Sequence, residues 1–205
     1  MQRAIEILEV LRFSSKLKSQ ERTIKLSWER QESVADHSWH LCLMALLVFP
    51  HLENKIDLLK VLKMALVHDL VEAEIGDIPY GITATNETIK KEKEKNERKK
   101  IKKIRDMVGG DLGKEIYDLW NEFEDMKTNE ARLVKTLDSL EAQFQSISFD
   151  INYWDDYFYK VALNKNKAQM FCKGEDILEK LTIEIARRME DEFRKIGLDV
   201  DKMWE

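Results

Sequence analysis

Glycine and proline are scarce in this chain of 205 residues, which contains 7 Gly and 2 Pro. The turns of β-sandwiches and open α/β sheets draw heavily on both residue types, so their scarcity argues against those folds. Hydrophobic residues make up 43% of the chain and charged residues 36%, a balance typical of long amphipathic helices around a continuous core. The composition predicts an all-α fold in one domain, or in one domain with a helical extension.

Cysteine is also rare, and long apolar runs are missing. The two cysteines, Cys42 and Cys172, form neither a CxxC pair nor a disulfide framework, which is typical of a reducing compartment. The N-terminal residues lack the small-residue cleavage pattern of a signal peptide. The longest apolar run, residues 41–49, is too short to span a bilayer. We expect a cytoplasmic protein with no membrane partner.

An excess of positive charge is lacking as well, since the net charge is -5. Binding to a nucleic-acid polymer rests on neutralisation of phosphates by Lys and Arg, so no such partner is expected. A small phosphorylated substrate needs only one basic pocket. Residues 90–105 run against the trend with ten basic and three acidic residues. This segment is either a solvated helical face or a basic lip beside an anionic substrate site.

Apolar residues recur at helical spacing through most of the chain. The pattern predicts helices over residues 1–18, 34–49, 58–75, 111–126, 129–148 and 175–196. Residues 19–33 are polar and predict an ordered loop, and the aromatic-rich residues 149–171 are more typical of packing or of a subunit contact than of chemistry. We expect a helical-bundle domain over residues 1–148, with a helical extension over 149–205 packed on it.

His68, Asp69 and Glu72 fall within one of the most apolar of these predicted helices. Residues three and four positions apart stack on one helical face, so we expect the three side chains to lie together. Burying an imidazole and two carboxylates costs several kcal/mol unless something compensates. A bound divalent cation would compensate all three.

Asp138 stands on the apolar side of its predicted helix, and His37 begins another apolar helix. A single histidine on an apolar helix is more commonly a hydrogen-bonded core residue than a ligand, but the combination is more specific. Together with His68 and Asp69, they offer two imidazole nitrogens and two carboxylates to a divalent metal with open positions for water and substrate. For His40, packing or a hydrogen bond is the preferred interpretation over a further ligand.

Four phrases carry a resemblance to a known family: LKSQER at 17–22, RQESVADHSW at 30–39, HDLVEAEIGDIP at 68–79 and VKTLDSLEA at 134–142. With them the chain resembles the HD-domain metal-dependent phosphohydrolases, and most of all their 5'-deoxynucleotidase group with its oxetanocin-resistance-like relatives. The phrases follow the family's order and cover about residues 1–145. The resemblance implies an HD-domain helical bundle and the metal ligands His37, His68, Asp69 and Asp138.

The resemblance also implies a role for Glu72 as the general acid/base. The alternative for Glu72 is a residue that orients a ligand histidine. Arg22 matches the arginine that meets the substrate phosphate; its alternative is a surface pair with Glu21 or Glu32. Asp77 matches a catalytic-pocket residue that binds the substrate near the sugar hydroxyls, and its alternative is a plain turn residue.

Two features of the sequence bear on the substrate contacts and on the number of metal ions. Thr23 stands where many deoxynucleotidases carry an aromatic residue, so the contacts to base and sugar can differ. Relatives with two or more metals carry additional histidines between the His-Asp pair and the final Asp, and this chain has no histidine between Asp69 and Asp138. One metal ion is therefore expected.

The sequence thus predicts metal-dependent hydrolysis of a nucleoside 5'-monophosphate, in particular a deoxyribonucleotide, to nucleoside and phosphate. One divalent ion is expected as cofactor, with Mn, Co, Ni, Fe, Zn and Mg all compatible with the ligands. The family resemblance implies a homodimer. Two alternatives stay open: an HD-domain hydrolase of another phosphate ester, such as a nucleoside triphosphate, and a non-enzymatic metal-binding helical module.

Overall fold

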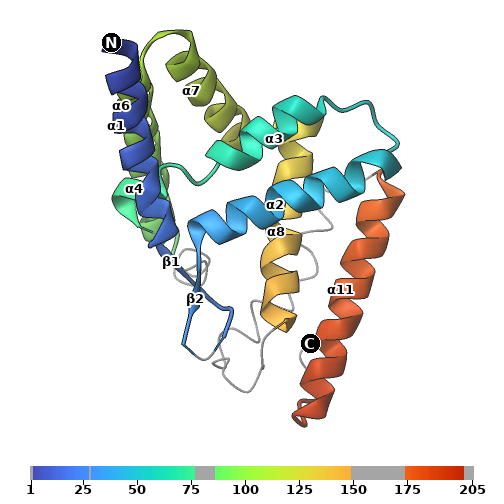
Figure 1. Ribbon diagram of the computed structural model, residues 1–205. Helices are drawn as coiled ribbons and strands as arrows, with labels where there is room; N and C mark the ends of the chain where they lie inside the picture. Colours follow the sequence, from blue (N-terminus) through green and yellow to red (C-terminus); the bar gives the residue numbers. More distant parts are fainter. Residues whose placement is uncertain (1, 28, 77–85, 149–173, 201–205) are drawn as a thin grey trace.

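The computed structural model describes residues 2–27, 29–76, 86–148 and 174–200 (Figure 1). Its elements are, in chain order, α1 (Gln2–Ser14), η1 (Ser15–Lys18), β1 (Glu21–Lys25), β2 (Gln31–Ser33), α2 (Val34–Val48), η2 (Phe49–His51), α3 (Leu58–Val67), α4 (Glu72–Ile75), α6 (Glu87–Val108), α7 (Gly110–Asp125), α8 (Asn129–Ile147) and α11 (Asp176–Lys195). The predicted all-α fold is confirmed. The aromatic-rich segment predicted at 149–171 lies outside the described residues.

The main hydrophobic core lies where α2, α3 and α8 pack against one another, with α2 crossing α8 in Figure 1. Leu41 and Ala45 of α2 are buried there with Met64 of α3 and Leu137 of α8. Their spacing within each helix places them on one face, as the sequence predicts. Leu178 joins the same core from α11, which packs along α8. The boundary between a domain and an extension at residue 148 stays a prediction.

Residues 19–33 form more regular structure than the predicted loop. β1 and β2 pair as a two-stranded antiparallel sheet, with Glu21 opposite Ser33 and Lys25 opposite Gln31. Ile24 is the one buried residue of β1, so the alternation that marks a half-buried strand is too short to recognise in the sequence. The hairpin leads directly into α2, whose first turn is held by the capping box between Ser33 and Asp36.

The single helix predicted over residues 58–75 is confirmed at both ends but is interrupted at residues 68–71. α3 ends at Val67, residues 68–71 form a tight turn with backbone hydrogen bonds three residues apart, and α4 follows. His68 Nδ1 lies 2.8 Å from the carbonyl oxygen of Ala65, which in a continuous helix would accept from the backbone N–H of Asp69. The predicted stop is confirmed, since Gly76 follows α4 with φ 75.

The basic run of residues 90–105 lies on α6. This helix buries Ile101, Ile104 and Val108 and turns most of its lysines outward. Several cations are paired, including Lys100 and Lys103 with Glu74 of α4. These contacts favour the solvated-face interpretation, and the basic-lip alternative stays a prediction. Among the described helices, none combines the length and the apolar composition that crossing a membrane would require.

Candidate metal centre

Four of the predicted site residues converge from three parts of the chain. His37 comes from the first turn of α2, His68 and Asp69 from the turn after α3, and Asp138 from the middle of α8. Both imidazoles are buried, whereas the side chains of Asp69 and Asp138 keep 19% and 23% of their exposure. The centre is therefore closed on its histidine side and open on its carboxylate side.

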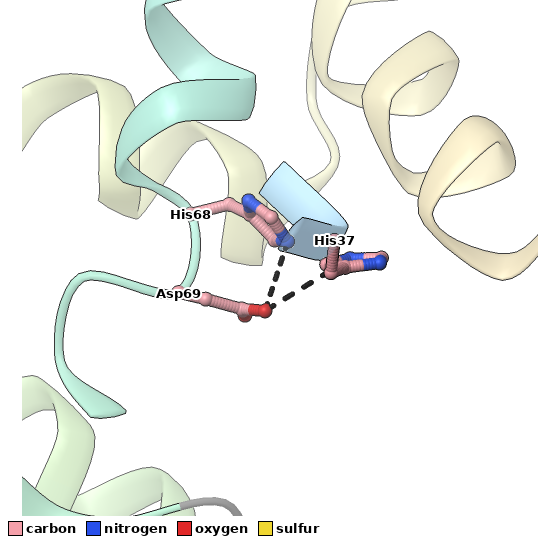
Figure 2. A group of neighbouring side chains, drawn as sticks. All are labelled: His37, His68 and Asp69. Atoms are coloured by element: carbon pink, nitrogen blue, oxygen red, sulfur yellow. Dashed lines mark ion pairs between the residues drawn. The ribbon is translucent and has the colours of Figure 1, made fainter. Parts of the chain in front are cut away.

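The ligating atoms of this group lie close together. His68 Nε2 is 3.1 Å and His37 Nε2 is 4.0 Å from Asp69 Oδ2, and Figure 2 shows the Asp69 carboxylate reaching toward both rings. The ligand atoms of His37, His68 and Asp69 all lie within 4.8 Å of one another. Asp138 joins the group through His37, with Oδ1 at 3.2 Å from Nε2.

The other ring nitrogen of each histidine already has a partner. Nδ1 of His37 contacts the carboxylate of Glu141, and Nδ1 of His68 contacts the carbonyl of Ala65. Both partners only accept hydrogen bonds at neutral pH, so each Nδ1 donates its N–H and each Nε2 faces the carboxylates. The Nε2 atoms instead lie close to carboxylate oxygens, His37 Nε2 at 3.2 Å from Asp138 Oδ1 and His68 Nε2 at 3.1 Å from Asp69 Oδ2. A divalent cation between these nitrogens and the carboxylates fits the donor set.

The electrostatics of the centre favour a cation. Burial alone would lower the pKa of His37, but hydrogen bonds to Asp138 and Glu141 raise it to about 10. Burial would raise the pKa of Asp69 and Asp138, yet the nearby histidines hold both below the usual value of 3.8. In the metal-free chain a proton on His37 supplies part of the positive charge that these carboxylates attract. A metal ion at Nε2 would take the place of that proton.

Glu141 is a residue that the sequence reasoning missed. It lies one turn after Asp138 on α8, is fully buried, and its second oxygen is 2.9 Å from Nδ1 of His40. His40 thus makes the hydrogen bond that was preferred over a ligand role. Neighbouring histidines hold the pKa of Glu141 at about 2 despite its burial. The available signal was an acidic residue on the same apolar helix face as Asp138.

Glu32, His37 and Glu141 form a second group with ligating atoms close enough for a metal. Arg22 already supplies positive charge here, with Nε at 3.0 Å from Glu32 Oε2. Burial and repulsion by Glu141 raise the pKa of Glu32 to about 7, so this carboxyl readily holds a proton. A metal ion is not needed to balance this second group.

Of the three residues expected to act on the substrate, the structure describes Arg22 and Glu72. Arg22 pairs with Glu32, which was its alternative interpretation, but Glu32 is buried and Arg22 is only partly exposed rather than on the open surface. Arg22 also lies 3.4 Å from Asp69 Oδ2. Glu72 is buried in the first turn of α4, three residues after Asp69. Glu72 was also considered as a residue that orients a ligand histidine. At the Nδ1 atoms this role belongs to Glu141 for His37 and to the Ala65 carbonyl for His68. Asp77 lies outside the described residues.

Comparisons of the sequence with known proteins find the HD domain family and proteins named 5'-deoxynucleotidase. The model of a family described as HD domain matches residues 14–178. The 5'-deoxynucleotidase HDDC2 of Dictyostelium discoideum is 38% identical over 150 residues, which cover 70% of this chain and 77% of that protein. The protein of the same name in Homo sapiens is 34% identical over 149 residues, covering 72% and 70%.

The fold also recurs in solved structures. A predicted metal-dependent phosphohydrolase from Magnetospirillum magnetotacticum superposes with a TM-score of 0.75 at 24% identity, covering 94% of this chain and 93% of the other. A conserved hypothetical protein from Pyrococcus furiosus gives a TM-score of 0.68 at 27% identity, covering 88% and 99%. This chain therefore shares its fold with both proteins.

Proposed function

Because the chain belongs to the HD domain family and is an HD-family phosphohydrolase, we propose that it hydrolyses nucleoside 5'-monophosphates, in particular deoxyribonucleotides. The products would be a nucleoside and inorganic phosphate. The observation that carries this proposal is the convergence of the buried Nε2 atoms of His37 and His68 on the Asp69 carboxylate, with the ligating atoms of all three residues within 4.8 Å of one another. The similarity to proteins named 5'-deoxynucleotidase supports the substrate class.

We propose one divalent metal ion, held by His37, His68, Asp69 and Asp138. Such an ion polarises a phosphoryl oxygen and lowers the pKa of a water molecule bound to it. The mixed nitrogen and oxygen donors suit Mn, Co, Ni, Fe, Zn or Mg, and they do not select among these metals. The partial exposure of both carboxylates leaves one side of the centre open to a substrate.

The remaining residues of the centre have roles that suit their positions. Arg22 would neutralise the substrate phosphate with its planar guanidinium group, which Glu32 and Asp69 already orient. Glu72, at the start of α4, would take a proton from the attacking water or return one to the leaving sugar oxygen. We assign Asp77 to the contact with the sugar, on the family resemblance alone.

We further propose a cytoplasmic homodimer. The free thiol of Cys42 and the lack of a disulfide framework in the sequence support a reducing compartment. Exposed apolar side chains on α2, among them Trp39 and Leu47, support an interface between copies of the chain. Light scattering at micromolar concentration tests the dimer, and a monomer would contradict it.

The function is tested by phosphate release from deoxy- and ribonucleoside mono-, di- and triphosphates, with Mn²⁺, Co²⁺, Mg²⁺, Zn²⁺ or a chelator. We expect metal-dependent release from monophosphates and a loss of at least about a thousandfold in Asp69→Ala, because one ligand and the partner of both histidines disappear together. Release confined to triphosphates would replace the proposed substrate. A metal-loaded protein that is inert on all of them would favour the non-enzymatic module.

A further inference from the structure

Lys135 is a cation at the metal centre to which no role has yet been given. It lies on α8, three residues before Asp138, and its Nζ is 3.6 Å from Asp138 Oδ2. The other oxygen of the same carboxylate faces His37. The Lys135 side chain keeps 28% of its exposure, so the ammonium group borders both the metal-ligand group and the solvent.

An aromatic ring lies beside this ammonium group. Nζ of Lys135 lies 4.2 Å from the centre of the Phe123 ring, a cation–π contact. The same ring packs edge-on against His68, with 5.3 Å between the ring centres. Phe123 is buried in the main core, so it gives Lys135 and His68 a common rigid wall. A lysine on an open helix face would have no such restraint.

Arg22 and Lys135, the two cations beside the carboxylates of the centre, differ in the number and length of their contacts with protein carboxylates. Arg22 contacts both Glu32 and Asp69 and keeps only 14% of its exposure. Among the residues that the structure describes, Lys135 pairs with a single carboxylate at 3.6 Å, beyond the usual range of about 2.7–3.2 Å for an N–H···O hydrogen bond. An ammonium group has three N–H donors, so Lys135 retains donors for a ligand on the open side.

We propose that Lys135 is a second phosphate-binding residue, which donates to a non-bridging oxygen of the substrate phosphate at the Asp138 side of the centre. Arg22 serves the Asp69 side. A phosphate monoester approaches several carboxylates here, and a compact cation beside Asp138 offsets their repulsion. The inference rests on the proposed function only in taking a phosphate as the ligand. The competing interpretation is a local ion pair that merely holds Asp138 in place.

The test compares Lys135→Met with Lys135→Arg and with Arg132→Met, a control that removes an exposed cation one turn earlier on the same helix. Titration calorimetry measures the affinity of each variant for Mn²⁺, and then the affinity of the Mn²⁺-loaded protein for inorganic phosphate. We expect Lys135→Met to weaken phosphate binding about tenfold or more, as for the loss of a charge-assisted hydrogen bond. Its Mn²⁺ affinity should not fall, since a cation next to a ligand is removed. Lys135→Arg should stay within about threefold of the wild type because it keeps the charge beside Asp138.

Two results would overturn the inference. Phosphate binding in Lys135→Met equal to that of the wild type would show that Lys135 makes no contact with phosphate. A parallel loss of Mn²⁺ affinity would show that it holds Asp138 instead. Phosphate binding is measured without turnover, so a wild type that binds phosphate through Lys135 but hydrolyses no nucleotide would reject only the proposed function.

Discussion

The two histidines of the metal centre are held in different ways. His37 is oriented by the carboxylate of Glu141, a side chain 104 residues away on another helix. His68 is oriented by the carbonyl of Ala65, three residues earlier at the end of its own helix. The α8 half of the centre therefore depends on tertiary packing and on a charge. The other half depends on the local backbone, which no side-chain substitution removes.

Replacing Glu141 should break the centre on the His37 side. In Glu141→Leu, Nδ1 of His37 and Nδ1 of His40 lose their common acceptor inside the protein. We expect Mn²⁺ affinity to fall about 10- to 100-fold, as is typical when the partner of a ligating histidine is lost. The metal-free protein should lose about 1–3 kcal/mol of unfolding free energy, the cost of leaving buried donors without acceptors.

The matched control for that experiment is Glu141→Gln, which keeps an acceptor oxygen but loses the charge. Its Mn²⁺ affinity should lie between those of the wild type and Glu141→Leu. Metal titration and urea denaturation give both quantities. Equal Mn²⁺ affinities in all three proteins would show that His37 is held by its burial alone, and the contrast between the two halves would disappear.

A second prediction uses the charge of His37. Its pKa in the metal-free chain is raised from 6.5 to about 10, so the ring is protonated at pH 8. A metal at Nε2 must displace that proton, so binding should release about one proton at this pH. Mn²⁺ affinity should rise about tenfold per pH unit between pH 7 and 9, to the extent that this proton alone is displaced.

The stability of the metal-free chain should change in the opposite sense. A raised pKa stabilises the fold fully below pH 6.5, and this contribution is lost as the pH rises through about 10. Calorimetry in buffers of different ionisation enthalpy counts the released protons, and urea denaturation follows the stability. Metal binding without proton release at pH 8 would contradict the assignment of His37 Nε2 as a ligand atom.

The contrast also explains which parts of the centre could be predicted from the sequence. His68, Asp69 and Asp138 are ionisable residues within apolar helical segments, and the cost of burying them marks them without a structure. The structure brings these residues together with His37. The helices themselves follow from apolar spacing, which is a local property of the chain.

Other features depend on contacts that the sequence does not encode locally. The turn at residues 68–71 interrupts an apolar pattern that continues to Ile75, and at this turn His68 Nδ1 contacts the carbonyl of Ala65. Adjacent side chains on a regular helix diverge by about 100°, and this turn lets His68 and Asp69 meet at one point. Glu141 lies on the same apolar helix face as Asp138, but its contact with His37 depends on the packing of α2 against α8, which the sequence does not show.

The smallest effect is expected on the half held by the backbone. Gly76 ends α4 at φ 75, a conformation that L side chains rarely adopt, and a Cβ there would meet the Gln20 side chain at an ordinary 3.6 Å. Gly76→Ala should therefore cost about 1–3 kcal/mol of unfolding free energy from backbone strain alone. Mn²⁺ affinity should stay within about twofold of the wild type, because the hydrogen bonds of Leu70 and Glu72 hold the turn independently of Gly76. Urea denaturation and metal titration of this variant measure both effects. A fall in metal affinity as large as that of Glu141→Leu would mean that the turn transmits strain to His68, and that the two halves of the centre are equally sensitive to changes beyond their ligands.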